Sequence, residues 1–239
     1  MATAERVAQP VRSDSIFFPA MAIAYALTVF VGFARTYFLA SYFQAPPLSE
    51  LRIVHGLIFT TWIALLITQT SLVAANRRDI HRKLGILGVG LAMAMIVVGP
   101  MLAVVALRSG HAPHGAPSPI AFFAIPIFAI ATFAILVTIG IANRGRADWH
   151  KRFMILSNAA ILPAAVARIP LGFIEHGGPP VFFALCDIFV LAVVAYDVAT
   201  MKRVHPATLW AGGILLVEQP LCLIVGGTSA WAAFAHALM

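Results

Sequence analysis

Two histidines that open long apolar segments are the residues best suited to hold a cofactor. His81 begins the element HRKLG, and His150 begins the element HKRFM. Since each precedes a run long enough to cross a membrane, the two imidazoles lie at the same membrane boundary. Histidines on facing helices are the ligands of a six-coordinate b-type haem, and nearby arginines pair with its propionates. The pattern predicts haem b bound by His81 and His150 as metal ligands, with Arg78 and Arg152 beside them.

A zinc site is an alternative at the same boundary. His205 shares the depth of His81 and His150, and three ligands at one depth are typical of catalytic zinc. The eight histidines are scattered singly, however, without the HxxxH pairs of zinc or di-iron membrane enzymes. A rhodopsin is excluded, because a retinal Schiff base needs a lysine in the last span and none follows Lys202.

Polar side chains inside the apolar segments predict a second site nearer the opposite boundary. Ionisable groups at membrane depth are costly and by default indicate function. The alternative is that Arg35 and Arg168 extend to lipid headgroups while Asp187 pairs with one of them. A cluster of these groups suits a small anionic or zwitterionic ligand bound in the outer half of the bundle. The predicted ligand-binding residues are Arg35, His55, Gln69, Asn158, Arg168, Asp187 and Glu218.

One apolar segment links the two predicted sites. At about 100° per residue, His150, Asn158 and Arg168 fall on a single stripe, whose ends are about 27 Å apart in a continuous helix. His55 and Gln69 likewise share a face of an earlier segment. We expect both faces to point toward the interior.

The composition shows what must position these residues. Hydrophobic residues make up 61% of the chain and charged residues 10%, whereas soluble domains have about 25% charged residues. A helix needs roughly 20 apolar residues to cross the hydrocarbon. We expect an all-α integral membrane bundle of seven transmembrane helices, one domain over 1–239 with a short cytoplasmic tail at 1–15, and an interior formed by the second, third, fifth and seventh spans. The expected spans are 16–40, 51–75, 84–107, 119–142, 152–174, 180–200 and 207–230.

The positive charges predict the orientation of this bundle. Twelve of the 16 lysines and arginines precede the first span or lie at the second–third, fourth–fifth and sixth–seventh connections. The positive-inside rule then predicts a cytoplasmic N-terminus and an outside C-terminus, in the multi-pass arrangement of a bacterial inner (cytoplasmic) membrane protein. The net charge of +7 is explained by this asymmetry and by contact with anionic headgroups of the lipid bilayer, so no nucleic-acid partner is expected.

The two histidine elements together resemble a family of uncharacterised bacterial multi-spanning membrane proteins. These proteins share an HRxLG element, here residues 81–85, and a later H(K/R)RxM element, here residues 150–154. The second element ends at an arginine about fourteen residues on, here Arg168. The matched region runs from about residue 51 to 170. The resemblance implies a multi-spanning membrane protein and assigns no activity.

A more distant likeness is to the two-haem transmembrane b-type cytochromes and ferric reductases. In these proteins four histidines on four helices hold one haem near each membrane face. The likeness implies an inner haem. For an outer haem His55 has no clear opposite ligand, because His176 follows the end of its span and His236 lies near the chain end.

Three functions remain open at this level. The first is a small membrane redox protein with b-type haem, whose outer polar residues meet a quinone or another small lipophilic ligand. The second is a non-catalytic accessory subunit of a larger complex, which contacts other membrane subunits. The third is a receptor or carrier for a small anionic or zwitterionic ligand.

Overall fold

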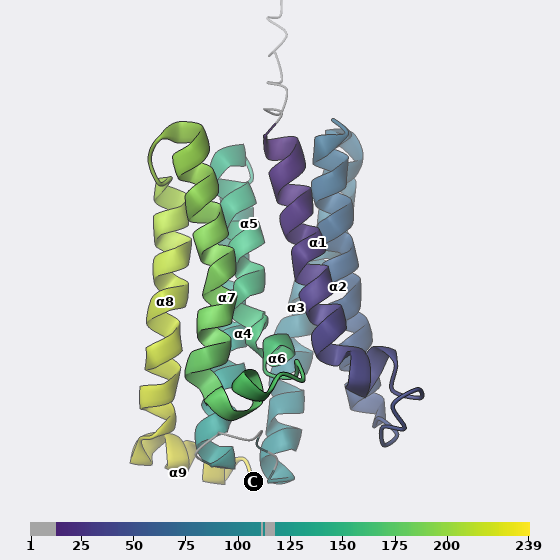
Figure 1. Cartoon of the computed structure of the whole chain (residues 1–239), viewed down its shortest axis with the longest axis vertical. Coiled ribbons are helices and arrows are strands. Elements are labelled where there is room, and N and C mark those ends of the chain that lie inside the picture. Colours follow the sequence, from purple (N-terminus) through teal and green to yellow (C-terminus); the bar gives the residue numbers. More distant parts are fainter. Residues whose placement is uncertain (1–12, 111, 113–117) are drawn as a thin grey trace, which may run out of the picture.

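The protein is a bundle of helices that lie side by side (Figure 1). The computed structural model describes residues 13–110, 112 and 118–239, and these residues include no strand. Residues 1–12 of the predicted tail lie outside the described residues. The helical elements are α1 (Asp14–Phe33), the π-helical turn η1 (Ala34–Phe38), α2 (Glu50–Ala74), α3 (Arg78–Arg108), α4 (Pro119–Ala142), α5 (Ala147–Ile161), α6 (Pro163–Val166), α7 (Gly172–Met201), α8 (Pro206–Gly226) and α9 (Ser229–Ala237).

Within the described residues, six helical segments are long and apolar enough to cross a membrane. They are α1 continued by η1, α2, α3, α4, α7 and α8. A helix suits a bilayer because it satisfies its own backbone polar groups, which lipid cannot do. The all-helical membrane fold agrees with the sequence. The count of seven crossings stays a prediction, and it depends on α5 and α6.

The predicted fifth span is interrupted. The helix α5 has 15 residues and ends at Ile161, and Pro163 begins the four-residue α6. Proline has no backbone N–H and cannot continue the hydrogen-bond pattern of the preceding turn. Arg168 therefore lies in the turn after α6. The prediction that His150 and Arg168 lie on one continuous helix is wrong.

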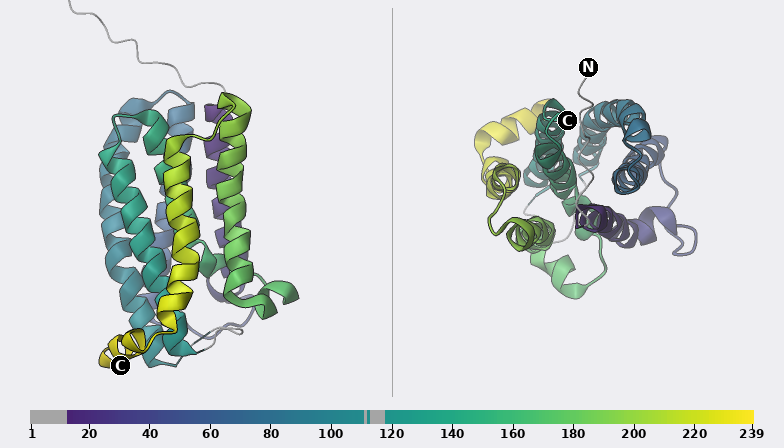
Figure 2. Two further views of the ribbon diagram at one scale, coloured as in Figure 1. Left: turned by 90° about the vertical axis from the view of Figure 1, so that its left-hand side faces the viewer. Right: turned by 90° about the horizontal axis from the view of Figure 1, so that it is seen from above.

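The last two predicted spans also have different bounds. The helix α7 begins at Gly172, before a bend at Gly178, whose φ of 63° lies in the left-handed region that glycine tolerates. Pro179 and Pro180 start the long part of the helix after this bend. The helix α8 ends at Gly226, and α9 is a separate short helix at that end of the bundle (Figure 2).

The interior is formed chiefly by α4 and α5. Half of the most apolar 18 residues of α4 are buried, compared with 17% of those of α3. The reason is the number of neighbours: α4 packs against α3, α5, α8 and α9, whereas α3 packs mainly against α2 and α4. The predicted interior is therefore wrong for the second and third spans, of whose most apolar residues 22% and 17% are buried, and it omitted the fourth span, α4.

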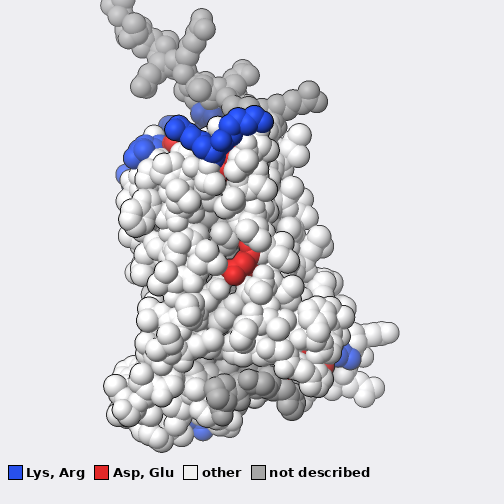
Figure 3. Space-filling model, turned by 60° about the vertical axis from the view of Figure 1, so that its left-hand side comes forward, with Lys and Arg blue, Asp and Glu red and all other residues white. Residues whose placement is uncertain are grey.

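The two ends of the bundle differ in charge. Lysines and arginines gather at the end where α1 begins (Figure 3), and they come from the α2–α3, α4–α5 and α7–α8 connections. We call this the basic end; α3, α5 and α8 also begin there. The C-terminus lies at the opposite end (Figure 1). This charge distribution is the one that the sequence predicts, and the orientation in a membrane stays a prediction.

Candidate functional site

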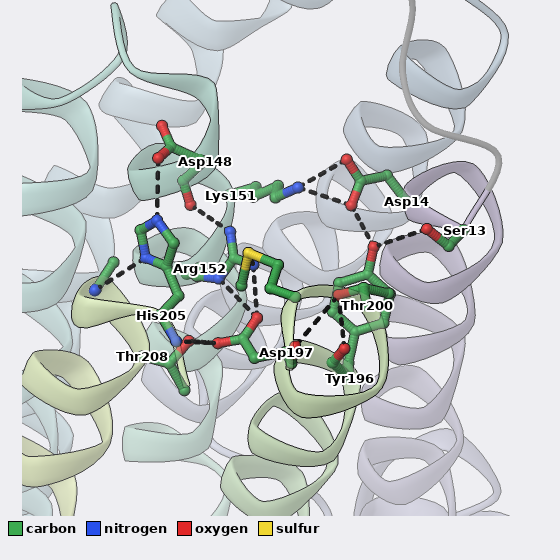
Figure 4. Close-up of polar contacts among 12 residues, drawn as sticks. Ser13, Asp14, Asp148, Lys151, Arg152, Tyr196, Asp197, Thr200, His205 and Thr208 are labelled. Carbon is green, nitrogen blue, oxygen red and sulfur yellow. Dashed lines mark hydrogen bonds and ion pairs between the residues drawn. The ribbon is translucent and has the colours of Figure 1, made fainter. Parts of the chain in front are cut away.

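A buried ion pair joins α5 to α7 at the basic end (Figure 4). Arg152 on α5 donates from Nε and Nη2 to Oδ1 of Asp197 on α7, at 3.0 and 2.5 Å. The two side chains are 2% and 0% exposed. Nη1 of Arg152 donates to the backbone carbonyl of Asp148 at 2.8 Å. All three guanidinium nitrogens therefore have acceptors, which a buried cation needs.

The second carboxylate oxygen of Asp197 is held from α8. It accepts from the Thr208 hydroxyl at 2.5 Å and from the backbone N–H of His205 at 3.0 Å. The ion pair thus connects three helices and attaches the start of α8 to the end of α7. Because its polar atoms are satisfied within the protein, the pair has a structural role in joining the helices and leaves little bonding capacity for a ligand.

The side chain of His205 caps α8. Its Nδ1 accepts from the backbone N–H of Ala207 at 3.0 Å, so Nε2 carries the proton and donates to Oδ2 of Asp148, also at 3.0 Å. Burial raises the pKa of Asp148, but the hydrogen bond from His205 and bonds from backbone amides outweigh it, and the pKa lies below its ordinary value. Both nitrogens of His205 are thus engaged.

The zinc alternative needed His205 as its third ligand, but both nitrogens of His205 are hydrogen-bonded within the protein. Among the described residues, no three His, Cys, Asp or Glu side chains are grouped so that they could hold a metal ion.

A second, half-buried group ties α1 to the same end. Lys151 on α5 donates to both carboxylate oxygens of Asp14 at 2.7 Å. The hydroxyl of Tyr196 on α7 donates to Asp14 and lies 3.3 Å from the Ser13 hydroxyl. In the sequence, Lys151 belongs to a cluster of positive charges that is typical of any cytoplasmic membrane boundary. In the structure, it makes a specific contact between α5 and α1.

His81 and His150 lie close together between α3 and α5. Their ring centroids are 6.2 Å apart and their planes are at 84°. Nδ1 of His150 lies 2.8 Å from the carbonyl oxygen of Gly140 on α4. Because a carbonyl only accepts, Nδ1 carries the proton and Nε2 keeps its lone pair. Nδ1 of His81 is buried and has no partner among the described residues.

The residues predicted around this pair have different positions. Arg78 is half-buried and lies within electrostatic range of His81, as does Arg82. Arg152 is bound to Asp197 instead. Gln69 also belongs here, because its backbone lies beside His81. The assignment of Gln69 to a site in the outer half is therefore wrong.

Asn158 lies deep in the bundle and joins α5 to α2. Its Oδ1 accepts from Nε1 of Trp62 at 2.9 Å, and its Nδ2 donates to the Met154 carbonyl at 2.8 Å. Asn158 is 1% exposed and Trp62 4%. This amide has its bonds within the protein, so its contacts indicate a structural role.

Basic side chains gather at the opposite end, where α2 begins. Arg168 lies within electrostatic range of both Arg52 and His55. Its guanidinium stands over the ring of Phe33, 4.9 Å from the centroid. The imidazole of His55 stacks on Phe59 at 4.0 Å, and its Nδ1 is buried without a partner among the described residues. We call Arg52, His55 and Arg168 the outer basic group.

The remaining predicted residues lie elsewhere. Asp187 on α7 accepts from Nε2 of Gln219 on α8 at 2.7 Å, and Glu218 is buried on α8. Arg35 is exposed in η1, 5.4 Å from the ring centroid of Phe43. The predicted mixed-charge site is therefore split, because α2 and the turn after α6 carry cations while α7 and α8 carry acids.

The sequence offered one signal for the buried ion pair. Arg152 and Asp197 have the same depth, each close to the basic end of its helix. Depth alone does not select Asp197 over Asp14 or Asp148 as the partner, since that choice depends on how each helix is rotated about its axis.

Comparisons with known proteins found no matching family model, no matching curated protein and no matching solved structure.

Proposed function

We propose that this chain is a small membrane redox protein of b-type cytochrome character, with His81 and His150 as the ligands of a haem. The observation that carries the proposal is the meeting of two imidazoles from different helices at 6.2 Å. The proposed setting is the inner membrane of a bacterium, with seven crossings, a cytoplasmic N-terminus and a lipid-soluble acceptor of the quinone class.

The separation of the rings would allow both imidazoles to hold one metal ion. A metal–imidazole bond is about 2.0–2.1 Å long, as known for zinc, so two rings bound to one ion would have centres roughly 6 Å apart. The hydrogen bond between His150 and Gly140 adds support. Metal-bound histidines usually donate their other ring N–H to a carbonyl or carboxylate, which orients the ring and makes the ligand nitrogen more basic.

The surrounding charges fit the group in part. A bound haem supplies one-electron chemistry. Arg78 and Arg82 are the described arginines within electrostatic range of His81, and we propose that they attract the haem propionates. Arg152 does not fit this role, because all three of its guanidinium nitrogens are bonded to other groups.

An absorption spectrum of the purified protein tests this function. We expect a Soret band, and an α band that sharpens when dithionite is added. The His150→Ala variant should lose both bands, because one of the two imidazoles that would hold the haem is missing. His205→Ala is the matched control, since His205 lies at the same end but has both nitrogens bonded elsewhere, and it should keep the spectrum. A colourless, folded wild-type protein expressed with adequate haem supply would exclude the proposal.

A second candidate function is the binding of a small anion by the outer basic group. The observation in its favour is that Arg52, His55 and Arg168 stand together, whereas Asp187 and Glu218 lie on other helices. Two guanidinium groups and an imidazole suit a phosphate or carboxylate.

Native mass spectrometry with phosphatidylglycerol, and thermal unfolding with inorganic phosphate, test the second candidate. We expect the wild type to retain the lipid or to be stabilised by phosphate. The double variant Arg52→Gln/Arg168→Gln should lose the effect, because both cations are removed. Arg35→Gln should keep it, since Arg35 lies on Phe43. Equal behaviour of all three proteins would count against an anion site.

A further inference from the structure

Glu218 is a carboxyl group in the apolar interior. It lies halfway along α8 and is 7% exposed, and its Oε1 has no hydrogen-bond partner among the described residues. A buried polar atom without a partner is uncommon in native proteins and needs a physical reason. The proposed haem site does not use this residue.

Among the described residues, no cation contributes to the electrostatic surroundings of Glu218. The thiols of Cys186 on α7 and Cys222 on α8 lie within its electrostatic range, and they are 2% and 0% exposed. The helix α4, which packs along α8, has no titratable side chain. The titratable side chains of α5 lie in its first two turns, at the basic end. At the far end of α8, the one titratable residue of α9 is His236, which is exposed.

This environment favours the neutral acid over the carboxylate. An unpaired buried charge is expensive in a medium of low polarity, and a carboxyl group avoids the cost when it holds a proton. A thiol is only a weak hydrogen-bond donor, so Cys186 and Cys222 compensate little of a negative charge. Glu218 therefore differs from Asp197, whose charge is matched by Arg152.

Further polar groups lie near Glu218, some deeper in the bundle and some nearer the surface. Tyr25 on α1 is fully buried, its hydroxyl has no partner among the described residues, and it lies within electrostatic range of Cys186. Toward the surface, Asp187 and Gln219 directly follow Cys186 and Glu218 in the sequence, and they are half-buried and bonded to each other. Acidic atoms are visible at mid-height on this side of the bundle (Figure 3).

We propose that Glu218 is a proton-binding site inside the membrane-embedded bundle, with the Asp187–Gln219 pair between it and the surface. The O–H bond of the acid forms when the carboxylate takes a proton from water, and it breaks when the proton returns to water. The ligand class is the proton itself. Proton binding at Glu218 does not require haem, so the labelling experiment below and the absorption spectrum test two independent proposals.

Labelling of the full-length wild-type protein with dicyclohexylcarbodiimide tests the proposal. This apolar reagent modifies protonated carboxyl groups: the acid proton moves to a reagent nitrogen, the carboxyl oxygen adds to the central carbon, and the adduct rearranges to an N-acylurea. We expect one added reagent mass, mapped by peptide mass spectrometry to Glu218, and less labelling as the pH rises. Labelling at Asp187 alone, absence of labelling, or labelling that does not change with pH would each overturn the proposal.

Two variants sharpen the result. Glu218→Gln keeps the size of the side chain and removes the acid, so it should lose the label and the infrared carbonyl band of a buried carboxylic acid. Glu175→Gln is the matched control, because Glu175 is an exposed glutamate in the first turn of α7, and this variant should keep both at Glu218. Should Glu218→Gln fail to fold, the peptide map of the wild type still decides the site. A carbonyl band that persists in folded Glu218→Gln would contradict the assignment.

Discussion

Replacing Arg152 with methionine is expected to lower the free energy of unfolding by about 3–5 kcal/mol, the usual cost of removing one partner of a buried ion pair. The cost arises because Asp197, which is 0% exposed, would keep its charge without a cation. Its bonds from Thr208 and the His205 backbone would remain. Reversible unfolding in mild detergent, followed by circular dichroism, measures the change.

The double variant Arg152→Met/Asp197→Asn separates the charge from the packing. With both charges removed, most of the lost stability should return, because a neutral amide at position 197 needs no cation and its oxygen can still accept from Thr208 and from the His205 backbone. The exposed pair Arg77–Asp79, whose side chains are 56% and 62% exposed, supplies the control, and Arg77→Ala should have no measurable effect. A double variant as unstable as Arg152→Met would show that the ion pair is not the cause.

Replacing Gly32 with alanine is expected to destabilise the bundle by about 1–3 kcal/mol, the typical cost of overpacking a core. A Cβ at position 32 would lie 2.2 Å from the carbonyl oxygen of Ala165. The contacted atom is backbone, so α1 and α6 would have to separate. The same unfolding measurement detects this, and the effect should be larger in Gly32→Val.

Gly213→Ala is the matched control for this contact. Gly213 lies inside α8, and a Cβ there meets no atom within 4 Å. Alanine is favoured over glycine in a helix by about 0.8–1.0 kcal/mol. This variant should therefore be as stable as the wild type or more stable. If both alanine variants behaved alike, the close approach of α1 to α6 would not be present in solution.

The sequence predicted the helical membrane fold because hydropathy is a local property. Each apolar run long enough to cross a bilayer must satisfy its backbone within a helix, whatever its neighbours are. The same reasoning explains the charge distribution, since the arginines and lysines of the connections lie at one end. The shared depth of His81 and His150 was likewise predictable from their places at the start of two apolar runs.

The interruption at Pro163 was the main local error. A proline inside an apolar run either kinks a helix or ends it, and the sequence does not distinguish the two outcomes. Because α5 ends at Ile161, Arg168 does not lie on the same helix face as His150. It lies near Arg52 and His55 instead. The polar stripe predicted over one helix is therefore divided between two separate sites.

Which polar groups meet was decided only by the tertiary structure. Sequence position determines the depth of a side chain in a membrane helix, but the rotation of that helix about its axis depends on how all its neighbours pack. Arg152 consequently pairs with Asp197 and not with Asp14 or Asp148, and Asp187 bonds to Gln219 and not to an arginine. The sequence alone determined the depth of each polar side chain along the bundle, whereas the packing of the helices determined which side chains bond to one another.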